Sequence, residues 1–286
     1  MAKKSEDLPP RIQHISKNTS NTLQKILILI KNHTGHDFSL YKESTIGRRT
    51  KRRMYTHHFD KLDEYYNYIK EHPFEIDALF NDILINVTSF FRDPNAFDTF
   101  ENKLISEVLD KKVNGDTVRI WVPGCSTGEE VYSIAMVIQK YIEKSGKNLE
   151  VRIFGTDIDG NAISTARSGS YTCAITSDIN QNYLHEFFTK EDNNYKIKKN
   201  IRNLTVFAIH DILMDPPFSK LDIISCRNLL IYMNKDAQNK ILSTFIYALK
   251  PEGILFLGHS ESISSFTKSF IILDSKWKIY KHNNEI

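Results

Sequence analysis

From Val118 onward the chain alternates short apolar segments with helical patterns, and this alternation restricts the fold more than any other feature. The apolar segments cover residues 118–122, 149–154, 204–209, 221–225 and 254–257, and the helical patterns cover 129–144, 160–168 and 235–249. Such alternation is typical of a parallel sheet covered by helices on both faces. The sequence therefore predicts an α/β domain over residues 111–286.

The part of the chain before this domain has a different pattern. Residues 1–20 are polar and contain Pro9-Pro10, which predicts a flexible leader. Over residues 21–110 apolar side chains recur at helical spacing. This stretch is predicted to form an N-terminal helical domain with its linker.

Two further segments do not fit the alternation. Residues 172–203 are longer than a loop requires and contain a hairpin signal around Asp192-Asn193-Asn194, so we expect a small inserted subdomain. The C-terminal stretch "SFIILDSKWKIYKH" predicts a strand pair with its turn at Asp274-Ser275.

Charge is unevenly distributed along the chain. Of the formal net charge of +3, residues 1–75 carry +5 and the remainder −2. The densest run consists of Arg48, Arg49, Lys51, Arg52 and Arg53. On a helix 48/52 and 49/53 lie on adjacent stripes and give one basic face. This face is either an ordinary solvated surface or a docking surface for an acidic partner, and nucleic acid is a rival partner.

The cysteines and the N-terminal sequence indicate the cellular compartment in which the protein works. Cys125, Cys173 and Cys226 are odd in number and lack C-x-x-C spacing, which argues against disulfides and a zinc site. The residues after Met1 contain no apolar signal segment, and the longest aliphatic run, 26–30, is too short to span a bilayer. We expect a cytoplasmic protein that does not insert into membranes.

The segment "IWVPGCSTGEE", residues 120–130, occupies the position of a ligand loop. In an open parallel sheet, ligands bind at the carboxyl ends of the strands, and the loop after the first strand is the usual site. Gly124 and Gly128 would let the backbone pass close to a ligand. A tight strand–helix turn without a ligand is the alternative interpretation.

The end of the second predicted strand narrows the kind of ligand. In "FGTDID", Asp157 stands where an acid would bind the hydroxyls of a nucleoside ribose, and Asp159 suits the cap of the next helix. The loop lacks G-x-G-x-x-G, and Glu129 and Glu130 place negative charge where a pyrophosphate would bind. A cationic nucleoside such as S-adenosylmethionine therefore fits better than NAD.

Six motifs in order resemble one family: "GHDFSLYKESTIGRRTKRRM", "NVTSFFRDP", "WVPGCSTGEEVYSIAM", "FGTDID", "DPPFSKLDIISCRNLLIYMN" and "GILFLGHSES". The chain resembles the CheR-type chemotaxis receptor glutamate methyltransferases over residues 21–285, and most closely the modules of methylesterase–methyltransferase fusions. The resemblance implies a Rossmann-like S-adenosylmethionine-dependent methyltransferase domain, an N-terminal all-α domain and a small inserted β-subdomain. It also implies methyl ester formation on receptor glutamates.

The resemblance also implies roles for individual residues, and no metal. Arg92 and Tyr232 are implied to lie at the reacting centre and to orient the acceptor carboxylate, which needs no general base because it is ionised at neutral pH. The implied cofactor contacts are Asn86, Thr88, Arg92, Gly124, Glu129, Asp157, Asp211, Ile212, Cys226, Arg227 and Asn228. Asp211 departs from the asparagine often found there.

For the partner, the resemblance implies the acidic cytoplasmic coiled coil of a chemotaxis receptor, bound by Arg48, Arg49, Arg52 and Arg53. The segment "FFTKEDNNYKIKK" lacks the glycine of members that bind a receptor tether, so binding is predicted to be tether-independent.

Other interpretations stay open at this point. Residues 86–92 could be an ordinary connector, and Arg227 a buried arginine paired with a carboxylate. Asp215-Pro216-Pro217-Phe218 resembles the D-P-P-Y/F motif of adenine methyltransferases, but it precedes the fourth predicted strand instead of following it. A non-catalytic module that senses the cofactor is the alternative from another functional class.

Overall fold

The computed structural model describes residues 17–283. The chain divides into two compact units between Leu84 and Ile85. Helix α1 already begins at Lys17, inside the predicted leader, and the rest of that leader lies outside the described residues. Each unit is described by itself below.

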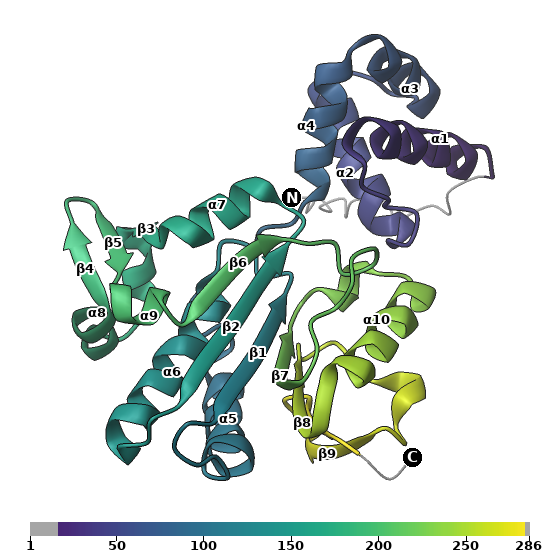
Figure 1. The fold of residues 1–286 in the computed structure, drawn as a ribbon. Coiled ribbons are helices and arrows are strands. Elements are labelled where there is room, and N and C mark those ends of the chain that lie inside the picture. The colour runs from purple at the N-terminus through teal and green to yellow at the C-terminus, as the bar shows by residue number, and fades with distance from the viewer. Residues whose placement is uncertain (1–16, 284–286) are drawn as a thin grey trace, which may run out of the picture. The chain divides into compact units, whose positions relative to one another are not determined.

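The first unit consists of four helices in the part of it that the structure describes. These are α1 (Lys17–Thr34), α2 (Glu43–Thr56), α3 (Leu62–Glu71) and α4 (Pro73–Ile83) (Figure 1). Pro73 occupies the start of α4, where a missing N–H leaves no hydrogen bond unmade. The buried side chains Ile26, Ile30, Ile69 and Leu79 form its interior and confirm the helical periodicity.

The second unit is built on a seven-stranded sheet with the order β6-β2-β1-β7-β8-β10-β9 (Figure 1). The strands are β1 (Thr117–Pro123), β2 (Glu150–Asp157), β6 (Thr205–Ile209), β7 (Leu221–Cys226), β8 (Leu249–Leu257), β9 (Phe270–Asp274) and β10 (Ile279–His282). The first five in this order are parallel, and β10 pairs antiparallel with both β8 and β9. The predicted parallel sheet and C-terminal strand pair are confirmed.

Helices cover both faces of this sheet because the side chains of a strand alternate between its faces. Val118, Ile120 and Val122 of β1 share one core with α5 (Pro94–Leu104), α6 (Glu129–Ser145) and α7 (Gly160–Ser168). On the opposite face, the ring of Trp121 meets Phe245 of α10 (Lys235–Ala248), with 5.8 Å between ring centroids.

The boundary between the two units differs from the predicted one. The helical part was predicted to continue to residue 110, but the structure assigns α5 and the short helix η1 (Ile105–Leu109) to the second unit. The reason is packing. Phe97, Phe100 and Leu104 are buried in the hydrophobic core beside the sheet, and the ring of Phe100 stacks on that of Phe256 in β8, with 4.6 Å between ring centroids.

The predicted inserted subdomain is present and begins slightly earlier, at Ser170. It contains β3 (Ser170–Thr172), η2 (Cys173–Ser177), α8 (Gln181–Phe187), β4 (Phe188–Glu191), β5 (Asn194–Ile197) and α9 (Lys199–Arg202). Its strands form an antiparallel sheet in the order β3-β5-β4. The β4–β5 turn lies at the predicted place, and Asp192 there has a φ of 48°.

Among residues 17–283, no helix combines the length and the apolar character needed to cross a membrane.

Candidate cofactor and active site

The candidate site lies where the strand order of the sheet reverses. Strand β1 is hydrogen-bonded to β2 on one side and to β7 on the other, so the chain winds in opposite directions from this point. The carboxyl ends of neighbouring parallel strands meet at one edge of a sheet, and a crevice at the reversal is the usual ligand site. Most of the predicted cofactor residues lie at the ends of β2 and β7, in the loops after β1, β6 and β7, or at the start of α6.

The loop after β1 needs both of its glycines. Gly124 has a φ of +67° and Gly128 a φ of +93°, in the region that side chains disfavour. A Cβ atom at Gly124 would lie 3.0 Å from the Leu229 side chain, and one at Gly128 would lie 2.9 Å from Ala166. The loop therefore combines a left-handed backbone at both glycines with close packing.

Asp157 at the end of β2 holds this loop in place. Its carboxylate accepts hydrogen bonds from the backbone N–H of Ser126 at 2.8 Å and of Asp159 at 3.0 Å. Burial raises the pKa of Asp157 above its usual value. A carboxylate has further lone pairs beyond these two contacts, so ribose hydroxyls could also donate to it. Asp159 caps α7, as predicted, by accepting from Asn161 and Ala162 N–H.

Glu129 begins α6 and is buried. The hydroxyl of Thr127 donates to its carboxylate, with 2.8 and 2.7 Å to the two oxygens. Burial raises the pKa of Glu129 because its ionised form loses contact with water. A cation bound beside this side chain would stabilise the ionised form.

Residues 85–93 form an irregular segment that lies along the cofactor loop. The amide of Asn86 donates to Asp159 and accepts from the Ser126 hydroxyl at 3.4 Å. Phe91 N–H donates to the hydroxyl of Ser133 in α6 at 3.0 Å. Hydrogen bonds therefore fix this segment to the loop after β1, to Asp159 and to α6, and its irregular backbone carries Thr88, which is half-buried.

Arg227 after β7 is a buried arginine paired with carboxylates, which was the alternative interpretation. Its guanidinium donates to Glu130 at 3.2 Å, to Asp93 at 2.8 Å and to the backbone carbonyl of Arg92 at 2.8 Å. The Ser225 hydroxyl also donates to Glu130, at 2.7 Å. Arg227 is thus a positioning residue that ties β7 to α6 and to the segment 85–93.

Glu261 is a residue of the site that the sequence analysis missed. Its buried carboxylate accepts from the backbone N–H groups of Asn228, Leu230, Ile231 and Gly258 at 2.6–3.3 Å. It holds the loop after β7 in a turn where Asn228 has a φ of 58°. Asn228 Oδ1 is buried and has no hydrogen-bond partner within residues 17–283. A buried acceptor left in this state fits a ligand that donates to it.

The two predicted catalytic side chains are both half-buried. Arg92 Nη1 donates to the carbonyl of Val87 in its own segment at 2.8 Å. Tyr232 ends the short helix η3 (Leu230–Tyr232), next to the turn that Glu261 holds. The described residues include no hydrogen bond between the Arg92 and Tyr232 side chains.

The two residues predicted to contact the adenine edge, Asp211 and Ile212, follow β6. Asp211 accepts from Leu213 N–H at 2.8 Å, and its own N–H donates to Asp215 at 2.8 Å, so these residues form a closed turn. Ile212 is half-buried in the same turn.

The DPPF motif lies in this connection before β7. The ring of Phe218 stacks on Phe154 at 4.5 Å and meets Trp121 at 5.4 Å. Phe218 therefore has a packing role in the structure.

Cys226 does not offer a reactive thiol. Its side chain is fully buried at the end of β7, and burial raises its pKa well above the usual value. The thiol of Cys125 is also buried, and burial likewise raises its pKa well above the usual value. Thiolates are the nucleophilic form, so neither cysteine serves as a nucleophile at neutral pH.

The chemistry of the loops fits S-adenosylmethionine. Buried Glu129 at the start of α6 is suited to an ammonium group, and half-buried Asp157 at the end of β2 is suited to ribose hydroxyls. The glycine turn lets the backbone approach a ligand closely, and within residues 17–283 Asn228 Oδ1 is a buried acceptor without a hydrogen-bond partner. Fold and loops together define a Rossmann-like S-adenosylmethionine-dependent methyltransferase domain.

The comparison with known families agrees over nearly the whole described chain. Residues 86–279 match the SAM binding domain of CheR methyltransferases, and residues 21–84 match the all-alpha domain of the same family. The chain belongs to the CheR methyltransferase family.

Three relatives show the extent of the similarity. An uncharacterized 104.1 kDa protein of Rhodobacter capsulatus is 37% identical over 86% of this chain, which spans 26% of that protein's length. A chemotaxis protein methyltransferase of Borreliella burgdorferi is 29% identical over 91% of this chain and 94% of its own length. A chemotaxis protein methyltransferase of Listeria monocytogenes is 30% identical over 82% of this chain and 87% of its own length.

Proposed function

We propose that this protein transfers a methyl group from S-adenosylmethionine to glutamate side chains of chemotaxis receptors in the cytoplasm. The observation that carries the proposal is a pair of carboxylates, buried Glu129 at the start of α6 and half-buried Asp157 at the end of β2, on either side of a glycine loop without pyrophosphate glycines. Relatives named chemotaxis protein methyltransferase that match along most of their length support the choice of substrate.

Glutamate methylation requires alignment more than acid–base catalysis. A glutamate with a pKa of about 4.3 is already a carboxylate at neutral pH, so no general base is needed. The bound cofactor supplies the electrophilic methyl group. We assign the alignment of the acceptor oxygen to Arg92 and Tyr232, and such alignment contributes ~7–11 kcal/mol in well-oriented reactions.

Buried side chains near Arg92 and Tyr232 position the backbone around the place where the methyl group would be transferred. Arg227 and Glu261 are buried and hold the loop after β7, so they fix the backbone from which Asn228 and Tyr232 extend. Exclusion of water from this region favours the reaction of an anion with a cationic donor, because charge is neutralised in the transition state.

The basic face of α2 is the proposed receptor-docking surface. Arg48, Lys51 and Arg52 are exposed on this helix, and an acidic receptor coiled coil is the complementary partner. Arg49 is half-buried. Arg53 instead donates to the fully buried Glu75 at 2.6 and 2.9 Å. Arg53 therefore contributes to the fold of this unit, and the docking surface we propose rests on the other arginines.

The direct test is transfer of a labelled methyl group. Tritiated S-adenosylmethionine is incubated with the protein and with cytoplasmic fragments of receptors, and the labelled product is treated with mild base. We expect label on the receptor fragment that base releases as methanol. Base-stable label, or label on DNA instead of protein, would contradict the proposal.

A further inference from the structure

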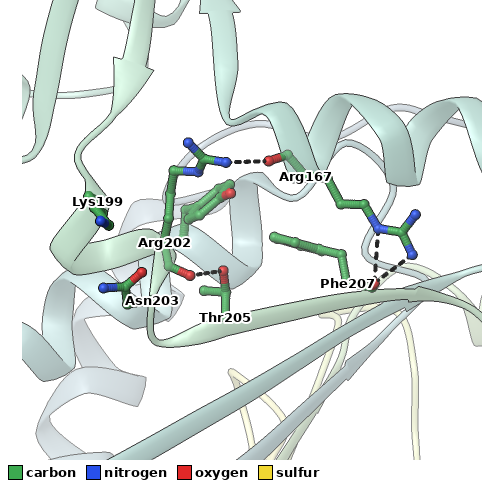
Figure 2. A pocket seen from close by; sticks show the side chains of 7 residues that line it. Arg167, Lys199, Arg202, Asn203, Thr205 and Phe207 are labelled. Atoms are coloured by element: carbon green, nitrogen blue, oxygen red, sulfur yellow. Dashed lines mark hydrogen bonds between the residues drawn. The ribbon is translucent and has the colours of Figure 1, made fainter.

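A hollow of about 370 Å³ lies where α6, α7, α9 and β6 come together, apart from the loops described above. Figure 2 shows side chains that line it. The lining residues are Tyr132, Arg167, Lys199, Arg202, Asn203, Thr205 and Phe207. The family resemblance and the proposed methyl transfer assign no role to this hollow.

The charge of the lining is entirely positive. Arg167, Lys199 and Arg202 contribute three cations, and none of the seven lining side chains is a carboxylate. Within residues 17–283, none of the three forms an ion pair with an aspartate or glutamate. Three cations beside one space without a neutralising group favour the binding of an anion.

The two arginines are held by neutral groups. Arg167 donates to the carbonyl of Phe207 through Nε at 3.1 Å and Nη2 at 2.9 Å, and Arg202 Nη2 donates to the carbonyl of Arg167 at 3.0 Å (Figure 2). These bonds fix the guanidinium groups but leave their charge in place. Each guanidinium has five N–H groups, so several donors remain on each. Figure 2 shows the Arg167 guanidinium beyond Phe207, whereas Arg202 and Lys199 lie on the other side of this ring.

The base of the hollow is apolar. Tyr132 and Phe207 are buried, and the Tyr132 hydroxyl already donates to the carbonyl of Ala166 at 2.7 Å. The Thr205 hydroxyl donates to the carbonyl of Arg202 at 2.9 Å. The groups left to meet a ligand are therefore mainly the guanidinium and ammonium donors, with the Asn203 amide beside them.

We propose that this hollow binds a small phosphate ester. A phosphate monoester is largely a dianion at neutral pH and presents three acceptor oxygens, which suits a lining that carries several cations and no carboxylate better than a single carboxylate does. The volume lies within the range of about 300–1,000 Å³ that is typical of small-molecule sites, so it can also hold the organic part of the ester. Phe207 and Tyr132 supply apolar contact for that part.

The hollow is separate from the cofactor loops, but one of its lining residues, Phe207, contacts the glycine loop after β1. The Phe207 ring lies against Gly128, where an added Cβ atom would come within 3.2 Å of it. An adenosine-containing probe could enter the cofactor site, so the test is made with that site filled.

The test is calorimetric titration of the whole protein, saturated with S-adenosylhomocysteine, with adenosine 5′-monophosphate, glycerol 3-phosphate and citrate in turn. We expect one-to-one, saturable binding of at least one phosphate ester. Lys199→Glu should weaken it at least fivefold, because the substitution reverses an exposed charge at the hollow.

Lys190→Glu is the matched control, since Lys190 is an exposed lysine on β4 of the same subdomain and does not line the hollow. It should bind the ester as the unaltered protein does. Absence of saturable binding for both esters, equal weakening by the two substitutions, or tighter binding of citrate than of either ester would each overturn the proposal. None of these results would affect the proposed methyl transfer.

Discussion

At the scale of single residues, we expect the buried carboxylate of Glu129 to contribute to the affinity for a cationic ligand. Burial raises the pKa of Glu129 above 4.5 when no cofactor is bound. A bound ammonium group would favour the ionised form and lower that pKa, so complex formation at low pH must release a proton. S-adenosylhomocysteine affinity should therefore be highest at neutral pH and fall as the pH decreases through the raised pKa.

Titration calorimetry between pH 7.5 and 5 measures this dependence. Glu129→Gln is the matched variant, because glutamine keeps the size of the side chain and does not titrate. Its affinity should be lower at pH 7.5 and should change less with pH, with Asp157 accounting for the remaining change. An identical pH profile in both proteins would remove Glu129 from contact with the ammonium group.

The reacting centre gives a second prediction at this scale. Tyr232→Phe removes one hydroxyl, so the loss of one hydrogen bond to the acceptor should raise the barrier by about 1–3 kcal/mol. Arg92→Ala should cost at least as much, and the double variant should lose less than the sum because both groups position one carboxylate. Single-turnover methyl transfer at saturating cofactor measures both effects.

Cofactor affinity and thermal unfolding are the controls for these two variants. Thermal unfolding should stay close to that of the unaltered protein, and cofactor affinity should fall less than the transfer rate, because Tyr232 is half-buried and the Arg92 side chain hydrogen-bonds to Val87 in its own segment. Wild-type transfer rates combined with lower melting temperatures would show that Arg92 and Tyr232 are structural.

At the scale of elements, the loop after β7 depends on an anchor from the loop after β8. Glu261 accepts from four backbone N–H groups, three of them at Asn228, Leu230 and Ile231. Glutamine has one acceptor oxygen and would turn an NH₂ group toward some of these donors. Glu261→Gln should therefore lower the free energy of unfolding by about 1–3 kcal/mol and weaken S-adenosylhomocysteine binding.

Chemical denaturation and calorimetry measure these two effects. Glu252→Gln, on the exposed part of β8, is the control and should leave both quantities unchanged. If Glu261→Gln alters stability but not cofactor affinity, the anchor serves the fold and not the site.

The first unit gives a prediction about an internal ion pair. Burial raises the pKa of Glu75, but hydrogen bonds from Arg53, Tyr65 and His57 lower it more, and the net result is below its usual value. Ionised Glu75 thus stabilises the fold above pH 4.5, and this contribution is lost as the pH falls through the lowered pKa. Arg53→Ala should cost about 3 kcal/mol, because it leaves a buried carboxylate with weaker compensation.

Equilibrium unfolding at pH 7 tests this value, with Arg48→Ala as the matched control. Arg48 is exposed on the same helix, so its removal should change the free energy of unfolding by less than about 0.5 kcal/mol. Equal effects of the two substitutions would mean that the Arg53–Glu75 pair adds no stability.

The elements were predicted well from the sequence, and the contacts between them were not. The spacing of apolar residues and the turn residues were sufficient to predict β1, α6, α7 and the β4–β5 hairpin, because these elements depend on residues close together in the sequence. The pairing of Glu261 with the loop after β7, or of Glu130 with Arg227, spans 30 residues or more and leaves no local signal. Glu261 stood inside the quoted "GHSES" motif, which was the one available indication.

At the scale of the whole molecule, the sequence showed two parts but placed the boundary too far along the chain. The spacing of apolar residues in α5 resembles that in α1 to α4. Such spacing shows that a segment is an amphipathic helix, but not which hydrophobic core the helix packs into. Only the burial of Phe97 and Phe100 against the sheet assigns α5 to the second unit. The basic helix α2 and the cofactor loops consequently belong to different compact units.

This division predicts that docking and chemistry can be separated. Arg48→Ala combined with Arg52→Ala should weaken binding to receptor fragments and flatten its dependence on salt, because both side chains are exposed cations on α2. The Arg52–Asp82 contact is long, at 3.8 Å, and joins an exposed arginine to a half-buried aspartate, so it has little energetic weight and the fold of the unit should be kept. S-adenosylhomocysteine affinity should not change.

Receptor-fragment binding at 50 and 300 mM salt measures the effect, and Lys25→Ala combined with Lys61→Ala is the control. These lysines are exposed on the same unit but lie outside α2, so the control removes equal charge from another surface. The α2 variant should lose more affinity at low salt than the control does. Equal losses would show that net charge alone attracts the receptor, and loss of duplex-DNA binding with receptor binding intact would favour nucleic acid as the partner of this helix.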